Sequence, residues 1–249
     1  MIYKNIVDST NIVLRKLAGS GAEEGTVVWA EQQMAGRGRH GRGWESPPGK
    51  GLWFSVLLRP ELSLPQIPLL TLVSAVSLVR GISRMTGFAP TIKWPNDLLA
   101  NGKKLAGILA EVQSEGREIK HVVVGIGINV NHTLSDFPPQ LADWATSLRL
   151  VLGRPWNRRA LLESVLEQLD KDYQEVRQDG FDRLLQLWRA HCCMLGQVVR
   201  VTDLVEGTLP WQGTALDIDQ NGALILMTDA GRRIVRAGDV SLSAGKEDE

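Results

Sequence analysis

The chain has 249 residues, of which 43% are hydrophobic and 22% charged, as in a globular protein with one substantial core and room for a small second domain. Lys+Arg and Asp+Glu number 28 each, so the overall charge predicts neither nucleic acid nor an anionic membrane as a partner. We expect every apolar run to be broken by charge or proline before it reaches membrane-spanning length, and the N-terminus lacks a secretory signal pattern. Since Cys192 and Cys193 are adjacent, which is poor geometry for a mutual disulfide, we expect a reducing cytoplasm.

The first ninety residues predict two helices and two strands. A short helix is expected within 8–21, capped by Asp8 or Ser9. Strands are expected at 26–30 and 52–58, with a loop rich in glycine and arginine between them. The apolar residues of 65–87 carry few charges, which predicts a long and largely buried helix.

The rest of the chain predicts a sheet, a helix pair and a small β-domain. Strands are expected at 90–94, 104–113 and 120–130, with turns at Asn101-Gly102 and Glu115-Gly116. Helical periodicity over 158–189 is interrupted at Gly180. Short alternating strands follow at 197–203, 211–219, 223–228 and 232–240, with turns at Gly207, Asn221-Gly222 and Gly231. These predict a β-barrel-like domain that begins near Gly196.

The loop "GRGRHGRGW" (36–44) is the main chemical signal. Arg37, Arg39 and Arg42 lie within six positions, with Glu45 as the nearby acid in the sequence. The GxGxxG dinucleotide pattern fails because two prolines follow where a helix should begin, and the segment is too short for an RG-rich RNA-binding tract. A solvated surface loop is the alternative. We favour an anionic ligand, because glycine N–H groups and arginine forks suit carboxylate and phosphate oxygens.

Three further motifs are weak alone. "KWPNDLL" (93–99) could be an ordinary turn. "GKKLAGIL" (102–109) carries two lysines, of which we expect Lys103 to be a solvated hairpin tip. "GIGINVN" (125–131) predicts a bulge or a wall on which a flat ligand lies. The histidines show no metal-ligand pairing, and no nucleophile signature is present.

Taken together, "DSTN", "QQMAGRGRHGRGW", "KWPNDLL", "KKLAGIL" and "GIGINVN" resemble, in order and spacing, the biotin protein ligases, the biotin–[acetyl-CoA-carboxylase] ligases. The resemblance covers essentially the whole chain. It implies an α/β fold of the class II synthetase-like type, a mixed sheet with helices on one side, in a catalytic domain of residues 1–195, followed by an SH3-like β-domain of residues 196–249. Since seven residues precede Asp8, we expect the monofunctional type, without an N-terminal DNA-binding domain.

The family implies a two-step reaction: biotin and ATP give biotinyl-5′-AMP and pyrophosphate, and a carrier lysine then takes the biotinyl group. The residues that the resemblance assigns to biotin are Ser9, Thr10, Asn11, Gln33, Gly36, Arg37, Lys104, Gly107 and Gly127. Those assigned to ATP and the adenylate are Arg37, Arg39, Arg42, Asn96, Lys104, Asn129 and Trp144. Lys104, Arg39 and Asp97 are the implied catalytic residues.

Two of these assignments stay open. Asp97, with Asn96, could hold Mg²⁺ or receive the proton of the acceptor lysine, and the sequence does not separate these roles. Trp144 could stack on adenine or be a core tryptophan at a helix start. The expected partner is a biotin carboxyl carrier domain, with neither nucleic acid nor membrane. Some relatives dimerise through sheet edges, so the oligomeric state is open. The rival functions are a lipoate or octanoate ligase and a non-catalytic biotin sensor.

Overall fold

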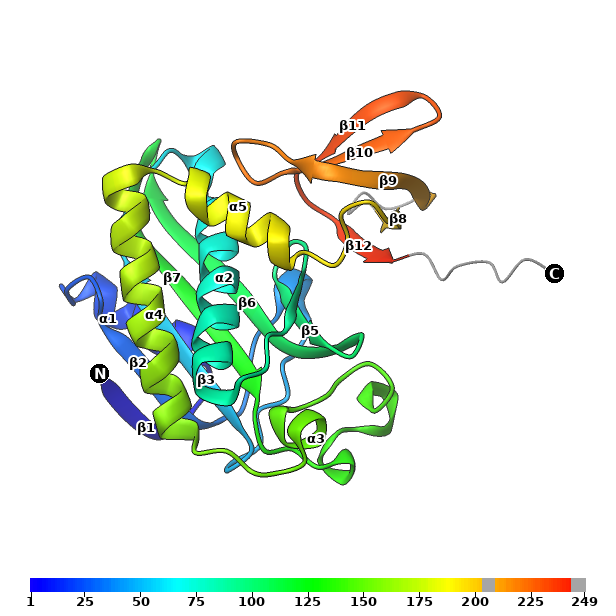
Figure 1. Ribbon diagram of the computed structural model, residues 1–249. Coiled ribbons are helices and arrows are strands. Elements are labelled where there is room, and N and C mark those ends of the chain that lie inside the picture. Colours follow the sequence, from blue (N-terminus) through cyan, green and yellow to red (C-terminus); the bar gives the residue numbers. More distant parts are fainter. Residues whose placement is uncertain (203–208, 243–249) are drawn as a thin grey trace.

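A mixed seven-stranded sheet forms the centre of the computed structural model, which describes residues 1–202 and 209–242 (Figure 1). The strand order is β1-β2-β3-β7-β6-β5-β4. The strands are β1 (Ile2–Val7), β2 (Val27–Gln33), β3 (Gly51–Leu58), β4 (Thr91–Lys93), β5 (Asp97–Ala100), β6 (Lys103–Glu115) and β7 (Glu118–Asn129). β1 and β2 pair in parallel and the other neighbours are antiparallel. The turn expected at Gly207 lies outside the described residues.

One face of this sheet is covered by α2 (Ile67–Thr86), α4 (Arg158–Asp179) and α5 (Asp182–His191), as the sequence predicts. α2 is the central helix, and its buried residues run almost uninterrupted from Ile67 to Ile82. It packs between the sheet and α4, so it is apolar on nearly every side. By length and composition alone the helical segment Leu64–Thr86 could cross a membrane, although Pro68 and Arg80 interrupt its apolar run. Because 72% of its apolar window is buried inside the protein, it is a core helix.

The opposite face carries α1 (Thr10–Gly19). Leu14 and Ala18 of this helix pack on Val28, Leu57 and Val123. These sheet residues alternate with those facing α2, since successive side chains of a strand point to opposite faces. α1 covers only part of this face, and the remainder, over β6 and β7, is where the candidate site lies.

The C-terminal strands form a second, antiparallel sheet of order β11-β10-β9-β8-β12. Its strands are β8 (Val198–Thr202), β9 (Trp211–Ile218), β10 (Leu224–Thr228), β11 (Gly231–Val235) and β12 (Asp239–Leu242). The hydrophobic core continues into it through residues such as Val199, Val201 and Leu224. The indole N–H of Trp94 also donates to the carbonyl of Gly222 at 2.9 Å. The small sheet is thus packed onto the larger part.

From the sequence we missed three short elements, the strands β1 and β5 and one helix, and merged two strands into one. β1 is an edge strand with mostly exposed residues, so its sequence shows no hydrophobic alternation. β5 begins directly after the Pro-Asn turn signal and is only four residues long. The single strand expected at 232–240 is two strands, β11 and β12. A short helix, α3 (Leu148–Leu152), begins at Ser147, whose side chain accepts the amide of Leu150.

Candidate active site

A cavity of about 440 Å³ lies on the sheet face that carries α1. Its walls come from the glycine-arginine loop, from β6 and β7, from residues 132–145 and from residues 239–241 of the C-terminal sheet. The sequence-predicted site residues that line it are Ser9, Thr10, Asn11, Gln33, Arg37, Arg39, Arg42, Asn96, Asp97, Lys104, Gly107, Gly127, Asn129 and Trp144. Gly36 is absent from this lining, but it braces the loop, because its carbonyl accepts the amide of Trp44 at 2.9 Å. The structure therefore brings segments far apart in sequence to one place.

Buried polar side chains occupy the α1 end of the cavity. Ser9, Thr10 and Asn11 are only 2–3% exposed. Both the amide and the hydroxyl of Thr10 donate to Gln33 Oε1, at 2.8 and 3.2 Å. The Ser55 hydroxyl lies 2.7 Å from Thr10 Oγ1 and 2.6 Å from Asn11 Oδ1. This network fixes the start of α1 against β2 and β3.

The same network decides which groups can meet a ligand. Asn11 Nδ2 donates to Glu111 at 2.7 Å and to the carbonyl of Leu109 at 3.5 Å, so its amide is already engaged. Gln33 donates one amide hydrogen to Ser46 and keeps a second. Among the described residues the Ser9 hydroxyl makes no capping hydrogen bond to α1, and it lines the cavity. Ser9 and Gln33 are thus the groups free to bind a polar ring, and Asn11 acts behind them.

Two facing glycines form the floor of the cavity, and Trp44 lies on them. Gly107 of β6 pairs with Gly127 of β7. A Cβ atom on either would lie 2.8 or 2.6 Å from the Trp44 ring, closer than real contacts allow. The resemblance assigns this flat surface to biotin, and in this structure it carries an indole of the protein itself. Trp44 is a cavity residue that our sequence analysis quoted but gave no role.

The cations of the cavity are paired with oxygens that come from distant parts of the chain. Lys104 Nζ lies 2.8 Å from Asp97 Oδ1 and 5.2 Å from the Trp44 ring centroid. The former contact is an ion pair without hydrogen-bond alignment, since Asp97 Oδ1 has no hydrogen-bond partner among the described residues. Arg37 pairs with Glu111 at 3.3 Å and Arg42 with Asp239 at 2.5 Å. The arginine loop is therefore less self-repulsive than its sequence suggests.

Arg39 differs from these cations, because it makes no ion pair with a described carboxylate. Its guanidinium donates to Asn96 Oδ1 at 3.2 Å and to the carbonyl of Gly238 at 3.3 Å. Burial lowers the pKa of Arg39, against the raising effect of Asp239 and Asp97. An anion entering the cavity would relieve this desolvated charge.

Residues 132–147 form another part of the cavity wall. Trp144 is 74% exposed and lines the cavity, so the alternative of a core tryptophan is wrong. The carbonyl of Trp144 accepts the Lys104 amide at 2.7 Å. Lys103 donates to the carbonyl of Ala142 at 3.1 Å, so it is not the solvated hairpin tip that we expected. β6 thus holds this wall through the side chain of Lys103 and the backbone of Lys104.

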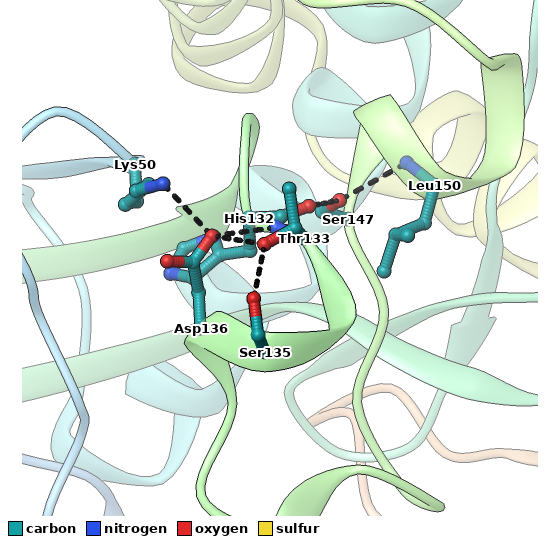
Figure 2. A network of polar contacts seen from close by, with 7 residues as sticks. All are labelled: Lys50, His132, Thr133, Ser135, Asp136, Ser147 and Leu150. Atoms are coloured by element: carbon teal, nitrogen blue, oxygen red, sulfur yellow. Dashed lines mark hydrogen bonds and ion pairs between the residues drawn. The ribbon is translucent and has the colours of Figure 1, made fainter.

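A polar network fixes the beginning of the same wall (Figure 2). Asp136 Oδ2 accepts hydrogen bonds from the amide and hydroxyl of Thr133, both at 2.7 Å, and pairs with Lys50 at 2.8 Å. The neighbouring His132 is buried, and burial lowers its pKa to about 4, so the ring is neutral near pH 7. The Ser147 hydroxyl donates to the carbonyl of His132 at 2.7 Å, which joins the two ends of the wall.

No cluster of three or more His, Cys, Asp or Glu side chains that could hold a metal ion occurs in residues 1–202 and 209–242. Cys192 and Cys193 are free thiols, and burial raises the pKa of Cys192 to about 11, which makes it a poor nucleophile. Among the described residues, the cations of the cavity are therefore better candidates for the reacting groups than a metal cluster or a thiol.

Comparison with known proteins agrees with this geometry. Residues 3–129 match the model of the biotin/lipoate A/B protein ligase family, and residues 194–243 that of the biotin protein ligase C terminal domain. The bifunctional ligase/repressor BirA of Bacillus subtilis is 41% identical over 242 residues, which cover 97% of this chain and 74% of BirA. The biotin–[acetyl-CoA-carboxylase] ligase of Paracoccus denitrificans is 34% identical, covering 94% of this chain and 96% of that protein.

The chain belongs to the biotin protein ligase family. Among solved structures, the Aquifex aeolicus biotin protein ligase in complex with biotin and ATP superimposes with a TM-score of 0.83 at 30% identity, covering 98% of each chain. The mixed sheet with its C-terminal five-stranded sheet is thus the fold of biotin protein ligases.

For this member of the biotin protein ligase family, sequence reasoning missed the residues that support the predicted ones. They are Trp44, Ser55, Glu111, His132, Asp136, Phe137 and Asp239. Glu111 could have been found from the sequence. It lies two and four positions after Leu109 and Gly107 in β6, so all three face the same side of the sheet. Ser55 is the polar residue inside an otherwise apolar strand. No sequence pattern pointed to Asp239, because its partner Arg42 lies 197 positions earlier in the chain.

Proposed function

We propose that this chain activates biotin with ATP as biotinyl-5′-AMP and transfers the biotinyl group to a lysine of a biotin carboxyl carrier domain. One observation carries the proposal. A single cavity holds hydrogen-bonding groups free for a neutral polar ring at one end and fixed cations suited to a carboxylate and phosphates at the other. Such an arrangement fits a molecule with a ureido ring, a carboxylate and a nucleotide.

Lys104, Arg39 and Arg42 are assigned to the first step. When the carboxylate attacks the α-phosphate, negative charge develops on the phosphate and on the departing pyrophosphate. Lys104 lies between Asp97 and Trp44, in reach of the middle of the cavity, and is assigned to the carboxylate and then to the acyl phosphate. Arg39 has no carboxylate partner among the described residues and is assigned to the phosphates, with Arg42 beside it.

Asp97 is assigned to the second step, in which a neutral amine must attack the mixed anhydride. Its Oδ1 is buried beside Lys104 without a hydrogen-bond partner among the described residues, and it can receive a proton from the incoming ammonium. Asn96 is held by its donation to the carbonyl of Ile108 at 2.9 Å, and it orients Arg39. Asp97 therefore serves the acceptor lysine directly.

In the first step, before the acceptor lysine arrives, the residues also fit Mg²⁺, with Asp97 as its protein ligand, because Asp97 Oδ1 has no hydrogen-bond partner among the described residues. Mg²⁺ commonly binds one or two carboxylates together with substrate phosphates and water, so a cluster of three acids is not needed. Bound there, the ion would neutralise charge on the ATP phosphates. Asp97 then has to exchange its ion pair with Lys104 for the metal.

The polar cluster favours biotin over lipoate. A site that hydrogen-bonds its substrate discriminates strongly against an analogue without those groups. The Ser9 and Gln33 groups match a ureido ring, whereas the dithiolane ring of lipoate offers them nothing comparable. A non-catalytic sensor would not need cations held beside an acid in mid-cavity. We propose a cytoplasmic location, consistent with two free cysteines.

We propose that residues 1–195 and 196–249 work as one unit. Thr202, Asp239, Val240 and Ser241 of the C-terminal part line the cavity, and Asp239 pairs with Arg42. The small sheet therefore contributes directly to the phosphate end.

The test is intact-mass analysis of a purified biotin carboxyl carrier domain after incubation with this protein, Mg-ATP and either biotin or lipoate. We expect a mass gain of one biotinyl group, lost when the acceptor lysine of the carrier is replaced by arginine. A lipoyl gain would refute the choice of substrate. No gain with either acid, together with tight biotin binding by calorimetry, would favour the sensor.

A further inference from the structure

Residues 132–147 contribute His132, Asp136, Phe137, Leu141, Trp144 and Ala145 to the cavity wall. Apart from two short 3-10 turns at Leu134–Asp136 and Pro139–Leu141 and an isolated bridge between Ala145 and Lys104, the segment has no regular structure. Its shape must therefore come from anchoring contacts rather than from a helix or strand ladder. Two lysines outside the segment supply such contacts: Lys103 binds its second half and Lys50 its first.

Asp136 receives the contact from Lys50 together with those of its own segment. One of its oxygens, Oδ2, accepts both Thr133 hydrogen bonds and the Lys50 ammonium (Figure 2). The backbone of Lys50 is fixed independently, because its carbonyl accepts the amides of Val130 and Asn131 at 3.3 and 2.6 Å. The Lys50 side chain can therefore be changed without releasing the end of β7.

Lys50 does not line the cavity, whereas Asp136 and its neighbour Phe137 do. Phe137 stacks on His132 with ring centroids 4.9 Å apart and an interplanar angle of 15°. His132 meets Trp53 edge to face at 5.9 Å, and Trp53 meets Trp44 at 6.4 Å. This row of aromatic rings leads from the ion pair to the indole that covers the two floor glycines. Displacing Asp136 would therefore loosen the wall that residues 132–147 and Trp44 form around the cavity.

We propose that the Lys50–Asp136 ion pair is a latch that holds residues 132–147 against the cavity, and that Lys50 is a positioning residue that sets how long the reaction intermediate is retained. The inference deepens the proposed function and rests on it for the identity of the ligand, biotinyl-5′-AMP. Lys50 acts through Asp136 and does not touch the ligand. Loss of the latch should also weaken the binding of biotin, because Asp136 and Phe137 border Gln33 in a second hollow and the aromatic row ends at Trp44 over the two glycines.

The experiment compares Lys50→Met, Lys50→Arg and Asp136→Asn with the unaltered chain. Biotinyl-5′-AMP release is followed by chasing preformed complex, KM for ATP by pyrophosphate exchange, and biotin affinity by calorimetry without ATP. We expect Lys50→Met to release the adenylate about 5- to 30-fold faster, the factor that loss of one partly buried charge-assisted contact typically brings. KM for ATP and the dissociation constant of biotin should rise in the same variant.

Two comparisons separate a latch from a general structural effect. Lys50→Arg should restore most of the retention, and the Lys50→Met/Asp136→Asn double variant should be no worse than the stronger single variant, because both remove one contact. Lys171→Met, which removes the exposed α4 pair with Glu167, is the matched control and should change nothing. An unchanged release rate in Lys50→Met, or a Lys50→Arg variant that releases the adenylate as fast as Lys50→Met, would overturn the inference.

Amide hydrogen exchange over residues 133–147 tests the latch without any ligand. We expect faster exchange there in Lys50→Met than in the unaltered chain, with β3 and β7 unchanged. Unaltered protection of the segment would refute the latch even if the reaction is as proposed. If the unaltered chain forms no biotinyl-5′-AMP, the proposed function fails, and this exchange measurement still decides the latch.

Discussion

Lys104 shows how this site holds a cation ready for chemistry. Its ammonium is fixed between the Asp97 carboxylate and the Trp44 ring, while the backbone of the same residue bonds the segment 144–146 through its amide and carbonyl. The charge is therefore oriented before any substrate binds, which is the condition under which a fixed charge stabilises a transition state most.

Replacing Lys104 by alanine removes this charge but little core volume. We expect biotin-dependent pyrophosphate exchange to fall by at least about 10²-fold while the fold survives. Thermal unfolding and circular dichroism establish that the variant is folded. Lys120→Ala, on an exposed part of β7, is the control and should retain activity. Near-normal exchange in folded Lys104→Ala would refute the assigned role.

His132 predicts a pH dependence of stability. Burial lowers its pKa from 6.5 to about 4 in the folded protein, so between these values the unfolded chain binds a proton that the folded chain does not. The free energy of unfolding should therefore fall as the pH drops from about 6.5 to 4, by up to about 3 kcal/mol from this residue. Urea unfolding of His132→Phe should show a shallower fall over that window. Parallel curves for the two proteins would contradict the prediction.

At the scale of elements, α2 and α4 are joined by a buried polar contact inside an apolar interface. Asp172 of α4 is 1% exposed and accepts hydrogen bonds from Ser77 at 2.8 Å and Gln168 at 2.9 Å, and it pairs with Arg80. A carboxylate in such a place is tolerated because several donors replace its water. It also fixes the rotation of α4 on α2.

Asp172→Ala should lower the free energy of unfolding by about 2–3 kcal/mol, since the bonds of a charged group are lost and donors are left without partners. Chemical denaturation measures this cost directly. Glu167→Ala, which breaks the exposed pairs with Lys171 of α4 and Arg84 of α2, should change stability by less than about 0.5 kcal/mol. Similar effects for the two variants would mean that the buried network adds nothing beyond surface charge.

The sequence predicted the long elements well and the short ones poorly. α2 and β7 carry strong hydrophobic patterns, because both pack against other elements along most of their length. β1 lies at the sheet edge and β5 has only four residues, so neither buries enough side chains to leave a pattern. The motif-bearing loop residues were placed by resemblance, whereas partners such as Glu111 and Asp239 depend on tertiary structure that no local pattern encodes.

At the scale of the molecule, the KWPND motif joins the two sheets as well as lining the cavity. Trp94 is buried, and its indole N–H reaches Gly222 in the turn between β9 and β10. Gly222 in turn lies against Leu72 of α2, since a Cβ there would come within 3.0 Å of that side chain. One tryptophan thus ties the core helix region, the cavity and the small sheet together.

Trp94→Phe should cost about 1–2 kcal/mol, because the Gly222 carbonyl loses its buried donor. In Trp94→Phe we also expect amide exchange to become faster than in the unaltered chain, and more so in β9 and β10 than in β3. The control is Trp29→Phe, since the indole nitrogen of Trp29 has no hydrogen-bond partner among the described residues. Equal effects of the two substitutions would show that lost ring volume, rather than the hydrogen bond, is responsible.

The part of the sheet face that α1 does not cover also affects how stable the folded chain is. Over β6 and β7 the layer above the sheet is a loop, an indole and a cavity rather than a helix, so a bound small molecule completes the packing of the folded chain. Anything that binds the folded form alone stabilises it, by about 2.7 kcal/mol at a hundred times its dissociation constant. The lifetime of this protein in a cell would therefore follow the supply of its own substrates, with scarcity exposing more of the chain to proteases and abundance protecting it.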